Sequence, residues 1–233
     1  MNYAIVIAGG SGTRMKSDLP KQFIKVKDKP ILVYTLESFQ NNEYIDCIEV
    51  VCIEGWEKEV ESYIKDYNLT KVKYIVKAGQ TVQESIRNGV FNLEGKCNND
   101  DIVIVHDGIR PIVDNHVLKD VIDKCKQYGN AVTSLPYNEQ IFLKNDDIST
   151  TQYIPRDTLR RVSTPQAYRF DLLDEKYHEA FNKKIGIYGS SYTNTMMIDL
   201  GVKLYFAEGS DKNIKLTTPD DLEIFEAMLN KNA

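Results

Sequence analysis

Three glycines and two small hydroxyl residues follow the first apolar run of the chain, in the segment Ala8-Gly9-Gly10-Ser11-Gly12-Thr13-Arg14-Met15. Glycine lets the backbone approach a ligand closely, and successive N–H groups in such a turn can bind an anion. Two cations, Arg14 and Lys21, flank a loop that could wrap a triphosphate. A tight turn with solvated cations is the plain alternative. The loop is not a P-loop, because no Gly-Lys-Ser/Thr follows, and Met15 occupies the third glycine position of the dinucleotide fingerprint.

The elements that would position this loop alternate between strands and helices. Short apolar runs separated by amphipathic stretches are typical of an α/β fold with a doubly wound (Rossmann-like), mostly parallel sheet. Ligands bind at the carboxyl ends of such strands, so the segments after Ile7, Val76 and His106 are expected to form the site. We expect strands at 4–7, 48–53, 72–76, 102–106, 131–135 and 203–206, and helices at 31–39, 56–67, 81–92, 117–128, 170–181 and after Thr218-Pro219.

Residues 137–165 break the alternation. They are polar, rich in Thr, Asp and Arg, and show no helical period. A stretch of this length without regular structure is unusual inside a compact domain, so we expect an arm that leaves the core. The whole chain, 1–233, is otherwise expected to form a single domain.

Composition excludes several classes of protein. The 233 residues carry a net charge of −5, so a broad basic surface for nucleic acid is not available. The N-terminus lacks the features of a secretory signal, and no run approaches the roughly 20 apolar residues of a membrane span. Four scattered cysteines and three histidines lack metal-ligand spacing. These features predict a cytoplasmic protein with reduced thiols and no zinc site.

Five motifs, in order along the chain, resemble those of one enzyme family. AGGSGTRM followed by PKQF resembles the signature of nucleotidyltransferases that activate a sugar or polyol phosphate. The match continues in Gly79-Gln80 with Ser85, in HDGIRP (106–111), in STPQAY (163–168), and in NIK (213–215) followed by TTPDDL (217–222). Together they resemble the CTP-dependent cytidylyltransferase family that contains 2-C-methyl-D-erythritol 4-phosphate cytidylyltransferase and ribitol-5-phosphate cytidylyltransferase.

This resemblance implies that a phosphate monoester attacks the α-phosphorus of CTP and that pyrophosphate leaves. The acceptor phosphate has a second pKa near 6 and is largely ionised at neutral pH, so no general base is required. Positioning and cations would then carry catalysis. The resemblance assigns catalysis to Arg14, Lys21 and Lys215, and CTP binding to Ala8, Gly9, Gly10, Gly12, Gly79, Gln80, Ser85 and Asp107. Mg²⁺ would bridge the phosphates, with Asp107 as its nearest protein carboxylate.

The resemblance also implies a homodimer in which residues 137–165 form a protruding β-arm for dimerisation that reaches into the acceptor site of the neighbouring subunit. Arg156 and Thr164 match acceptor-phosphate contacts from the second chain, and Arg110 matches one from the first. A solvated basic stretch is the plain alternative for Arg156. An arginine suits a phosphate, because its planar fork can bind two oxygens.

Departures from the family pattern gather in the acceptor region. Asn138-Glu139-Gln140 stands where methylerythritol enzymes typically carry Asp-Thr, and Ser191-Tyr192-Thr193 stands where they carry Thr-Asp-Glu. A phenol thus replaces a carboxylate that could bind acceptor hydroxyls. Gln140, Ser191 and Tyr192 are therefore expected to contact a different hydroxyl-rich acceptor, such as ribitol 5-phosphate or a glycerol phosphate. Products of that kind feed teichoic-acid or capsule synthesis in bacteria.

Three other functions are compatible with parts of the pattern. The first is the methylerythritol enzyme of isoprenoid synthesis, against which the altered acceptor region argues. The second is a sugar-1-phosphate nucleotidyltransferase that uses another NTP, which would share the glycine loop without the later motifs. The third is a protein that only binds nucleotide, which would not require Arg14, Lys21 and Lys215 together. The segment Lys77–Val82 lacks the paired glycines and the arginine usual in the family, so selectivity for CTP is less securely predicted than the phosphate chemistry.

Overall fold

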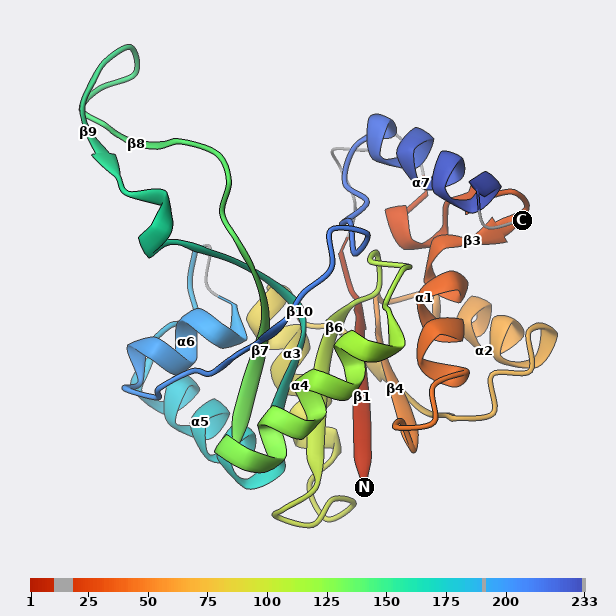
Figure 1. Ribbon diagram of the computed structural model, residues 1–233. Helices are drawn as coiled ribbons and strands as arrows, with labels where there is room; N and C mark the ends of the chain where they lie inside the picture. The colour runs from red at the N-terminus through yellow and green to blue at the C-terminus, as the bar shows by residue number, and fades with distance from the viewer. Residues whose placement is uncertain (11–18, 190–191, 232–233) are drawn as a thin grey trace.

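A seven-stranded sheet forms the centre of the computed structural model, which describes residues 1–10, 19–189 and 192–231 (Figure 1). The strand β10 runs antiparallel to both of its neighbours, and the other pairs in the sheet are parallel. The expected doubly wound, mostly parallel sheet is therefore confirmed. Its order is β11 (Phe206–Glu208), β7 (Asn130–Pro136), β10 (Arg160–Arg169), β6 (Ile102–Asp107), β1 (Asn2–Ala8), β4 (Cys47–Cys52) and β5 (Val72–Lys77).

Helices cover both faces of this sheet. One face packs on α1 (Ile31–Gln40), α2 (Glu57–Asp66) and α4 (Asn115–Tyr128), and the other on α3 (Val82–Asn92), α5 (Phe170–Lys183) and α6 (Thr193–Asp199). In Figure 1, α4 lies in front of the sheet and α3 behind it. Alternate residues of each strand point to opposite faces, so β1 sends Val6 to the first core and Ile5 to the second. Among the described residues, no helix is long and apolar enough to cross a membrane.

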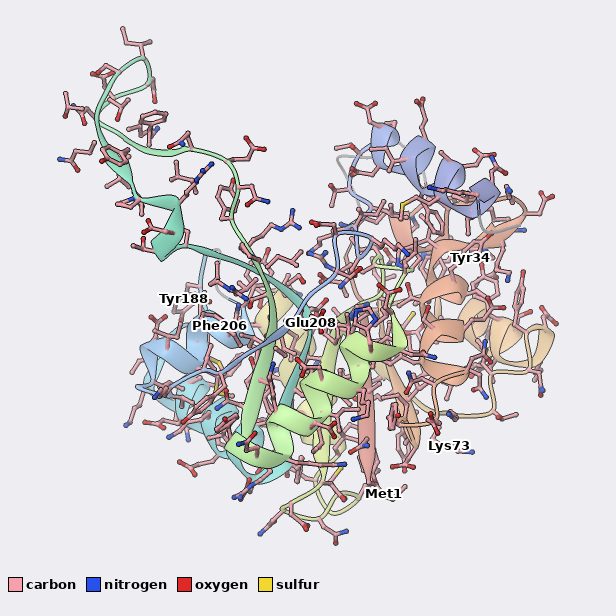
Figure 2. The ribbon with its side chains drawn as sticks, in the orientation of Figure 1. Met1, Tyr34, Lys73, Tyr188, Phe206 and Glu208 are labelled. Atoms are coloured by element: carbon pink, nitrogen blue, oxygen red, sulfur yellow. The ribbon has the colours of Figure 1, made fainter. Side chains whose placement is uncertain are left out.

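A third, smaller apolar cluster seats the C-terminal helix α7 (Pro219–Lys231) beside the ribbon of β2 (Lys25–Val26) and β3 (Lys29–Pro30). Phe225 of α7 is fully buried, and its ring meets Tyr34 of α1 edge-on at 5.1 Å. Tyr34 is labelled in Figure 2, below α7. Just before the helix, the backbone N–H of Leu216 donates to the oxygen of Ile109 at 2.9 Å. This packing fixes the segment that carries Lys215 against the turn after β6.

The expected β-arm is present. The hairpin of β8 (Ile141–Lys144) and β9 (Thr150–Ile154), followed by the short helix η3 (Arg156–Thr158), projects away from the sheet (Figure 1). The prediction is wrong for the last six residues of 137–165, because β10 begins at Arg160. Two arginines and Pro165 conceal this strand in the sequence. Pro165 is tolerated because the β7–β10 register shifts between Val162 and Gln166.

The last strand of the sheet begins three residues later than predicted, because side-chain hydrogen bonds from Asn130 hold the residues before it. The strand is Phe206–Glu208 rather than 203–206. Before it, Nδ2 of Asn130 donates to the oxygen of Lys203 at 3.0 Å, and Oδ1 of Asn130 accepts from the N–H of Tyr205 at 3.2 Å. An asparagine side chain thus holds the chain at the sheet edge where backbone pairing was expected. The helix α6 was also not anticipated, because it is short and follows a loop.

Glu49 is buried on the face of the sheet that α3 covers, with an exposed fraction of 1%. Its Oε2 accepts a hydrogen bond from Nδ2 of Asn92 at 2.6 Å, and its Oε1 has no hydrogen-bond partner among the described residues. Burial raises the pKa of Glu49 to about 8, against the opposing effects of Asn92 and Lys96. The carboxyl is therefore mostly neutral at pH 7.

Glu49→Gln is expected to make the stability of the fold less sensitive to pH. The folded-state pKa of about 8 lies above the roughly 4.3 of an unfolded glutamate. The contribution of Glu49 is therefore fully present below the unfolded value and is lost as pH rises through the folded value. Relative to wild type, the variant should gain roughly 4 kcal/mol between about pH 4 and 8. Chemical denaturation between about pH 4 and 8 measures the effect, and exposed Glu43→Gln is the control. Parallel curves for Glu49→Gln and wild type would contradict it.

Candidate active site at the carboxyl edge of the sheet

The segments that follow β1, β5 and β6 meet at one edge of the sheet, as the sequence predicted. The strands are parallel and lie in the order β6, β1, β4, β5, so their carboxyl ends share that edge. Two cavities open there, on either side of Ile7 and Asp107. A smaller space between them, of about 30 Å³, shares Ile7 and Val82 with the first cavity and Asp107, Thr164 and Tyr192 with the second.

The first cavity, of about 690 Å³, contains the residues predicted to hold the nucleotide. Its floor depends on a close approach between two loops, since a Cβ on Gly9 would lie 2.6 Å from the Cβ of Ala78. Glycine is required there for this steric reason. Gly9, Gly10, Gly79, Gln80 and Ser85 all line this cavity, whereas Ala8 lies just beneath it at the end of β1.

The start of α3 is held by its own hydrogen bonds. Oγ1 of Thr81 accepts from the N–H of Glu84 at 3.1 Å, and the carboxylate of Glu84 accepts from the N–H groups of Gln80 and Thr81, which together make a capping box. Oγ of Ser85 donates to the oxygen of Thr81 at 2.8 Å and accepts from the N–H of Gly79 at 3.1 Å. The segment Gly79–Ser85 is thus rigid, with the positive end of the α3 dipole facing the cavity.

Lys21 stands at the glycine loop because its neighbours are anchored. Nε2 of the buried Gln22 donates to the oxygen of Ala8 at 2.7 Å, and Phe23 stacks on Trp56 with ring centroids 4.3 Å apart. A Cβ on Gly10 would lie 3.8 Å from Cε of Lys21. The predicted Arg14, Gly12 and Ser191 lie outside the described residues. The anchoring roles of Gln22 and Phe23 were not predicted, although PKQF was recognised as a motif.

A compact ion cluster lines the second of these cavities, and its Asp107 also borders the smaller space that separates this cavity from the first. Oδ2 of Asp107 accepts from Nε of Arg110 at 3.0 Å and lies 3.1 Å from Nζ of Lys215. Side-chain exposures are 23% for Asp107, 15% for Arg110 and 29% for Lys215. Burial alone would raise the pKa of Asp107, but the charges of Lys215 and Arg110 outweigh it and lower the pKa to about 2. Asp107 is therefore ionised at any physiological pH.

Backbone hydrogen bonds fix this cluster from three directions. The N–H of Asp107 donates to Oγ1 of Thr164 at 3.2 Å, and Nη1 of Arg110 donates to the oxygen of Asn213 at 2.7 Å. Nδ2 of Asn213 donates to the oxygen of Thr164 at 2.6 Å, which closes the ring of contacts. Sequence reasoning placed Asn213 in a motif but assigned it no part in the site. The sequence signal that could have identified Asn213 was a short amide side chain two positions before Lys215, the predicted catalytic lysine.

Buried His106 supports the turn beneath the cluster. Its Nε2 lies 3.0 Å from the backbone oxygen of Arg110, which can only accept, so this nitrogen carries the proton. Burial lowers the pKa of His106 to about 4, and the ring is neutral at physiological pH. His106 therefore stabilises the turn from Asp107 to Arg110 through its hydrogen bond to the backbone oxygen of Arg110, and it adds no charge to the site.

The second cavity, of about 310 Å³, contains the described residues that were predicted to bind the acceptor near the junction. Arg110, Thr164 and Tyr192 line it together with Asp107 and Lys215. Nζ of Lys215 lies 5.7 Å from the ring centroid of Tyr192. Asn194 and Thr195, in the first turn of α6, also line this cavity and were not predicted, because α6 itself was not anticipated.

Two predicted acceptor residues do not reach either cavity of their own chain. Gln140 and Arg156 lie exposed on the arm, and Nη1 of Arg156 is 3.5 Å from the oxygen of Asn138. Within the described residues, the chain alone does not bring them to the cluster at Asp107. Their contribution to the site of a neighbouring subunit stays a prediction.

The structure also shows a group of potential metal ligands away from the two cavities. Glu94, Asp174 and His178 offer three ligand atoms within 4.8 Å of one another. Spacing along the sequence did not reveal them, because they come from two segments 80 residues apart. His178 Nε2 lies 3.1 Å from Oε1 of Glu94, within hydrogen-bond distance, and 3.6 Å from Oδ1 of Asp174, so contacts among the three side chains account for the group.

Comparison with known proteins matches almost the whole chain. The family model for 2-C-methyl-D-erythritol 4-phosphate cytidylyltransferase (IspD) matches residues 2–231. A ribitol-5-phosphate cytidylyltransferase from Lacticaseibacillus paracasei is 58% identical over 228 residues, which cover 98% of this chain and 97% of the relative. A 2-C-methyl-D-erythritol 4-phosphate cytidylyltransferase from Clostridium acetobutylicum is 37% identical, with coverages of 100% and 99%. The crystal structure of the corresponding Francisella tularensis enzyme (IspD) superposes with a TM-score of 0.79 at 27% identity and covers 97% of this chain and 98% of its own.

Proposed function

The chain belongs to the 2-C-methyl-D-erythritol 4-phosphate cytidylyltransferase (IspD) family, and we propose that it joins CTP to a polyol phosphate, with ribitol 5-phosphate as the first candidate. It is a CTP-dependent nucleotidyltransferase by family. One observation carries the proposal: the cluster of Asp107, Arg110 and Lys215 lines a hydroxyl-lined cavity, and its Asp107 also borders the narrow space that separates this cavity from the nucleotide-sized one. The relative that is 58% identical and named for ribitol 5-phosphate supports this choice of acceptor.

The reaction would proceed by direct displacement. An oxygen of the acceptor phosphate forms a bond to the α-phosphorus of CTP, and the bond from that phosphorus to the bridging β-oxygen breaks, so that pyrophosphate leaves. Lys21 beside Gly10 would stabilise the triphosphate, and Lys215 would stabilise charge at the α-phosphate. Arg110 would bind the acceptor phosphate. No side chain is asked to remove a proton, because the attacking phosphate is already ionised.

Asp107 suits a hard cation such as Mg²⁺. Three carboxylates line the two cavities among the described residues: Glu54, Glu84 and Asp107. Of these, only Asp107 also borders the narrow space between the two cavities, where the two substrates would meet. Mg²⁺ commonly binds one or two carboxylates, water and substrate phosphates, so a single carboxylate at this point fits it. When bound, the ion would neutralise charge on the phosphates.

The acceptor cavity offers neutral groups for a polyol. Tyr192, Asn194 and Thr195 line it with a phenol, an amide and a hydroxyl, each able to bond to alcohol groups. Arg110 and Lys215 at its inner end can hold the phosphate. A polyol phosphate combines these two kinds of group in one molecule, and the arm of a second subunit would complete the cavity with Arg156.

Mg²⁺-dependent pyrophosphate release, with CTP and one acceptor at a time, tests the proposal. The acceptors are ribitol 5-phosphate, glycerol 3-phosphate and 2-C-methyl-D-erythritol 4-phosphate. We expect kcat/KM for a polyol phosphate to exceed that for the methylerythritol substrate by at least about 100-fold, because the cavity would bind each misplaced hydroxyl poorly. Turnover with methylerythritol phosphate at a comparable rate would show that Tyr192 tolerates both acceptors, and it would overturn the assignment.

A further inference from the structure

A buried chain of hydrogen bonds joins the first turn of α3 to the first turn of α6. The hydroxyl of Tyr177, in α5, lies 3.0 Å from Oε1 of Gln83 and 2.7 Å from Oγ1 of Thr193. Nε2 of Gln83 donates to the backbone oxygen of Gly186 at 2.7 Å. The exposed fractions are 0% for Tyr177, 1% for Thr193 and 2% for Gln83. Three elements that are distant in sequence thus share one polar network inside an otherwise apolar core.

The direction of each hydrogen bond follows from the groups themselves. Oε1 of Gln83 has no proton, so the hydroxyl of Tyr177 must donate to it. That hydroxyl has one proton only, and Oγ1 of Thr193 must therefore donate to the oxygen of Tyr177. The chain runs from Thr193 through Tyr177 to Gln83, and burial raises the pKa of Tyr177, which keeps the donor protonated. Losing any member leaves a buried polar group unpaired.

The fourth member, Gly186, ties the network to α6 a second time. Gly186 has a φ of +62°, and a Cβ there would lie 2.7 Å from Cα of Met196. Only glycine accommodates both the left-handed backbone and this close approach. The segment that receives the hydrogen bond from Gln83 therefore rests directly on the helix whose first turn contains Thr193.

The two ends of the network adjoin the two halves of the candidate site. Gln83 follows the segment Gly79–Thr81, which lines the nucleotide cavity. Thr193 follows Tyr192, and its other neighbour, Asn194, lines the acceptor cavity with Tyr192. The network lies behind both cavities and touches neither ligand space with its own polar atoms, since only Thr193 borders the narrow space between them.

We propose that Gln83, Tyr177 and Thr193 are positioning residues that set the acceptor-binding turn of α6 relative to the nucleotide-binding turn of α3. The inference rests on the proposed function, because it takes the cavity at Tyr192 as the acceptor site. Its effect is larger at α6. The capping box and the Ser85 hydrogen bonds hold the nucleotide segment independently of the network. The hydrogen bonds between Thr195 and Tyr192 are internal to the first turn of α6, whereas Thr193 links that turn to α5. Disrupting the network therefore displaces the acceptor site and spares the nucleotide site.

Tyr177→Phe removes one hydroxyl and keeps the packing of the ring. We expect the KM for the polyol phosphate to rise about tenfold, while the Kd for CTP changes by less than about twofold. Tyr3→Phe is the matched control. Tyr3 belongs to the same apolar cluster, its hydroxyl donates to the oxygen of Lys96 at 3.0 Å, and it lies near the start of β1, at the opposite end of that strand from the site. Met1, which is labelled in Figure 2, marks this end of the sheet. Both variants remove a buried phenol hydroxyl that forms hydrogen bonds, but only Tyr177→Phe should alter the acceptor KM.

Substitutions of Thr193 separate the hydrogen bond from the packing. Thr193→Ser retains the donor and is expected to keep the wild-type acceptor KM, whereas Thr193→Val retains the shape and should behave like Tyr177→Phe. Because the two residues act through one hydrogen-bond chain, the double variant Tyr177→Phe with Thr193→Val should raise the acceptor KM little beyond the single variants. If the increases in acceptor KM of the two single variants multiply in the double variant, Tyr177 and Thr193 act independently, and the shared role is overturned.

Hydrogen exchange in α6 tests the network without any activity. The N–H of Met196 donates to the oxygen of Tyr192 at 2.9 Å, so exchange in residues 192–200 reports the order of the first turn. Exchange there should be faster in Tyr177→Phe than in Tyr3→Phe and wild type. If wild type turns over neither polyol phosphate, the proposed function fails, and exchange alone decides on the network. Exchange that is unchanged in Tyr177→Phe, or an acceptor KM within about twofold of wild type in an active enzyme, overturns the proposal.

Discussion

Lys21→Ala is expected to lower kcat by about 10²–10³-fold, with a much smaller change in the KM for CTP. Lys21 lies beside Gly10, held there by the bond from Gln22 to Ala8 and by the stack of Phe23 on Trp56. A fixed ammonium at this point costs no reorganisation when charge develops on the phosphates, so its removal acts mainly on the transition state. Single-turnover measurement of CTP consumption, with a saturating acceptor, reports the chemical step directly.

Lys25→Ala is the matched control for Lys21→Ala. Lys25 is an exposed lysine in β2, four positions further along the chain. It changes the net charge by the same amount, so any general electrostatic effect on anionic substrates appears in both variants. Wild-type kcat in Lys21→Ala would remove Lys21 from the reaction. Equal losses in the two variants would show that net charge, rather than position, is responsible. Arg14→Ala is expected to act as Lys21→Ala does, on the strength of the motif alone.

The core strands could be predicted because burial on both faces leaves a simple signal. β1 and β6 contain short continuous apolar runs, and β4 is apolar apart from Glu49; parallel strands between two helical layers require such runs. β10 gives no such signal, since it begins with Arg160 and Arg161, which pair with the end of β7 next to the arm, and contains Pro165 at a shift of register. Its inclusion is decided by pairing with β6 and β7, a tertiary effect that local sequence does not encode.

The candidate site was predictable to the extent that it follows strand ends. Gly79, Asp107 and Arg110 come directly after strands or within the turn that follows, and the parallel sheet brings them to one edge. The joining contacts were not predictable, because they depend on distant segments: Asn213 reaches Thr164 over 49 positions, and Tyr177 reaches Gln83 over 94. Single polar residues in apolar helices are ordinary in sequence, and their roles emerge only from the packing.

Mixing Lys21→Ala with Arg156→Ala is expected to restore activity that neither variant has alone. Arg156 lies exposed in η3, between the hairpin of the arm and β10, and lines neither cavity of its own chain, whereas Lys21 lies beside Gly10. If the arm completes the acceptor site of a neighbour, each mixed dimer has one site with both residues intact and one site with neither. Random pairing makes half of the dimers mixed, so the mixture should reach about a quarter of wild-type activity.

Lys21→Ala mixed with Lys215→Ala is the control for this rescue, because both lysines belong to the half of the site that one chain provides, around Gly10 and Asp107. Every site in that mixture lacks one lysine, and no activity should return. Differently tagged variants, exchanged and then co-purified, establish that mixed dimers have formed. Rescue in the first mixture alone requires that Arg156 acts in trans on the catalytic half that carries Lys21. Absence of rescue in co-purified mixed dimers would instead place Arg156 in the site of its own chain or outside the reaction, and Arg156 would then have no part in the acceptor site of the neighbouring subunit.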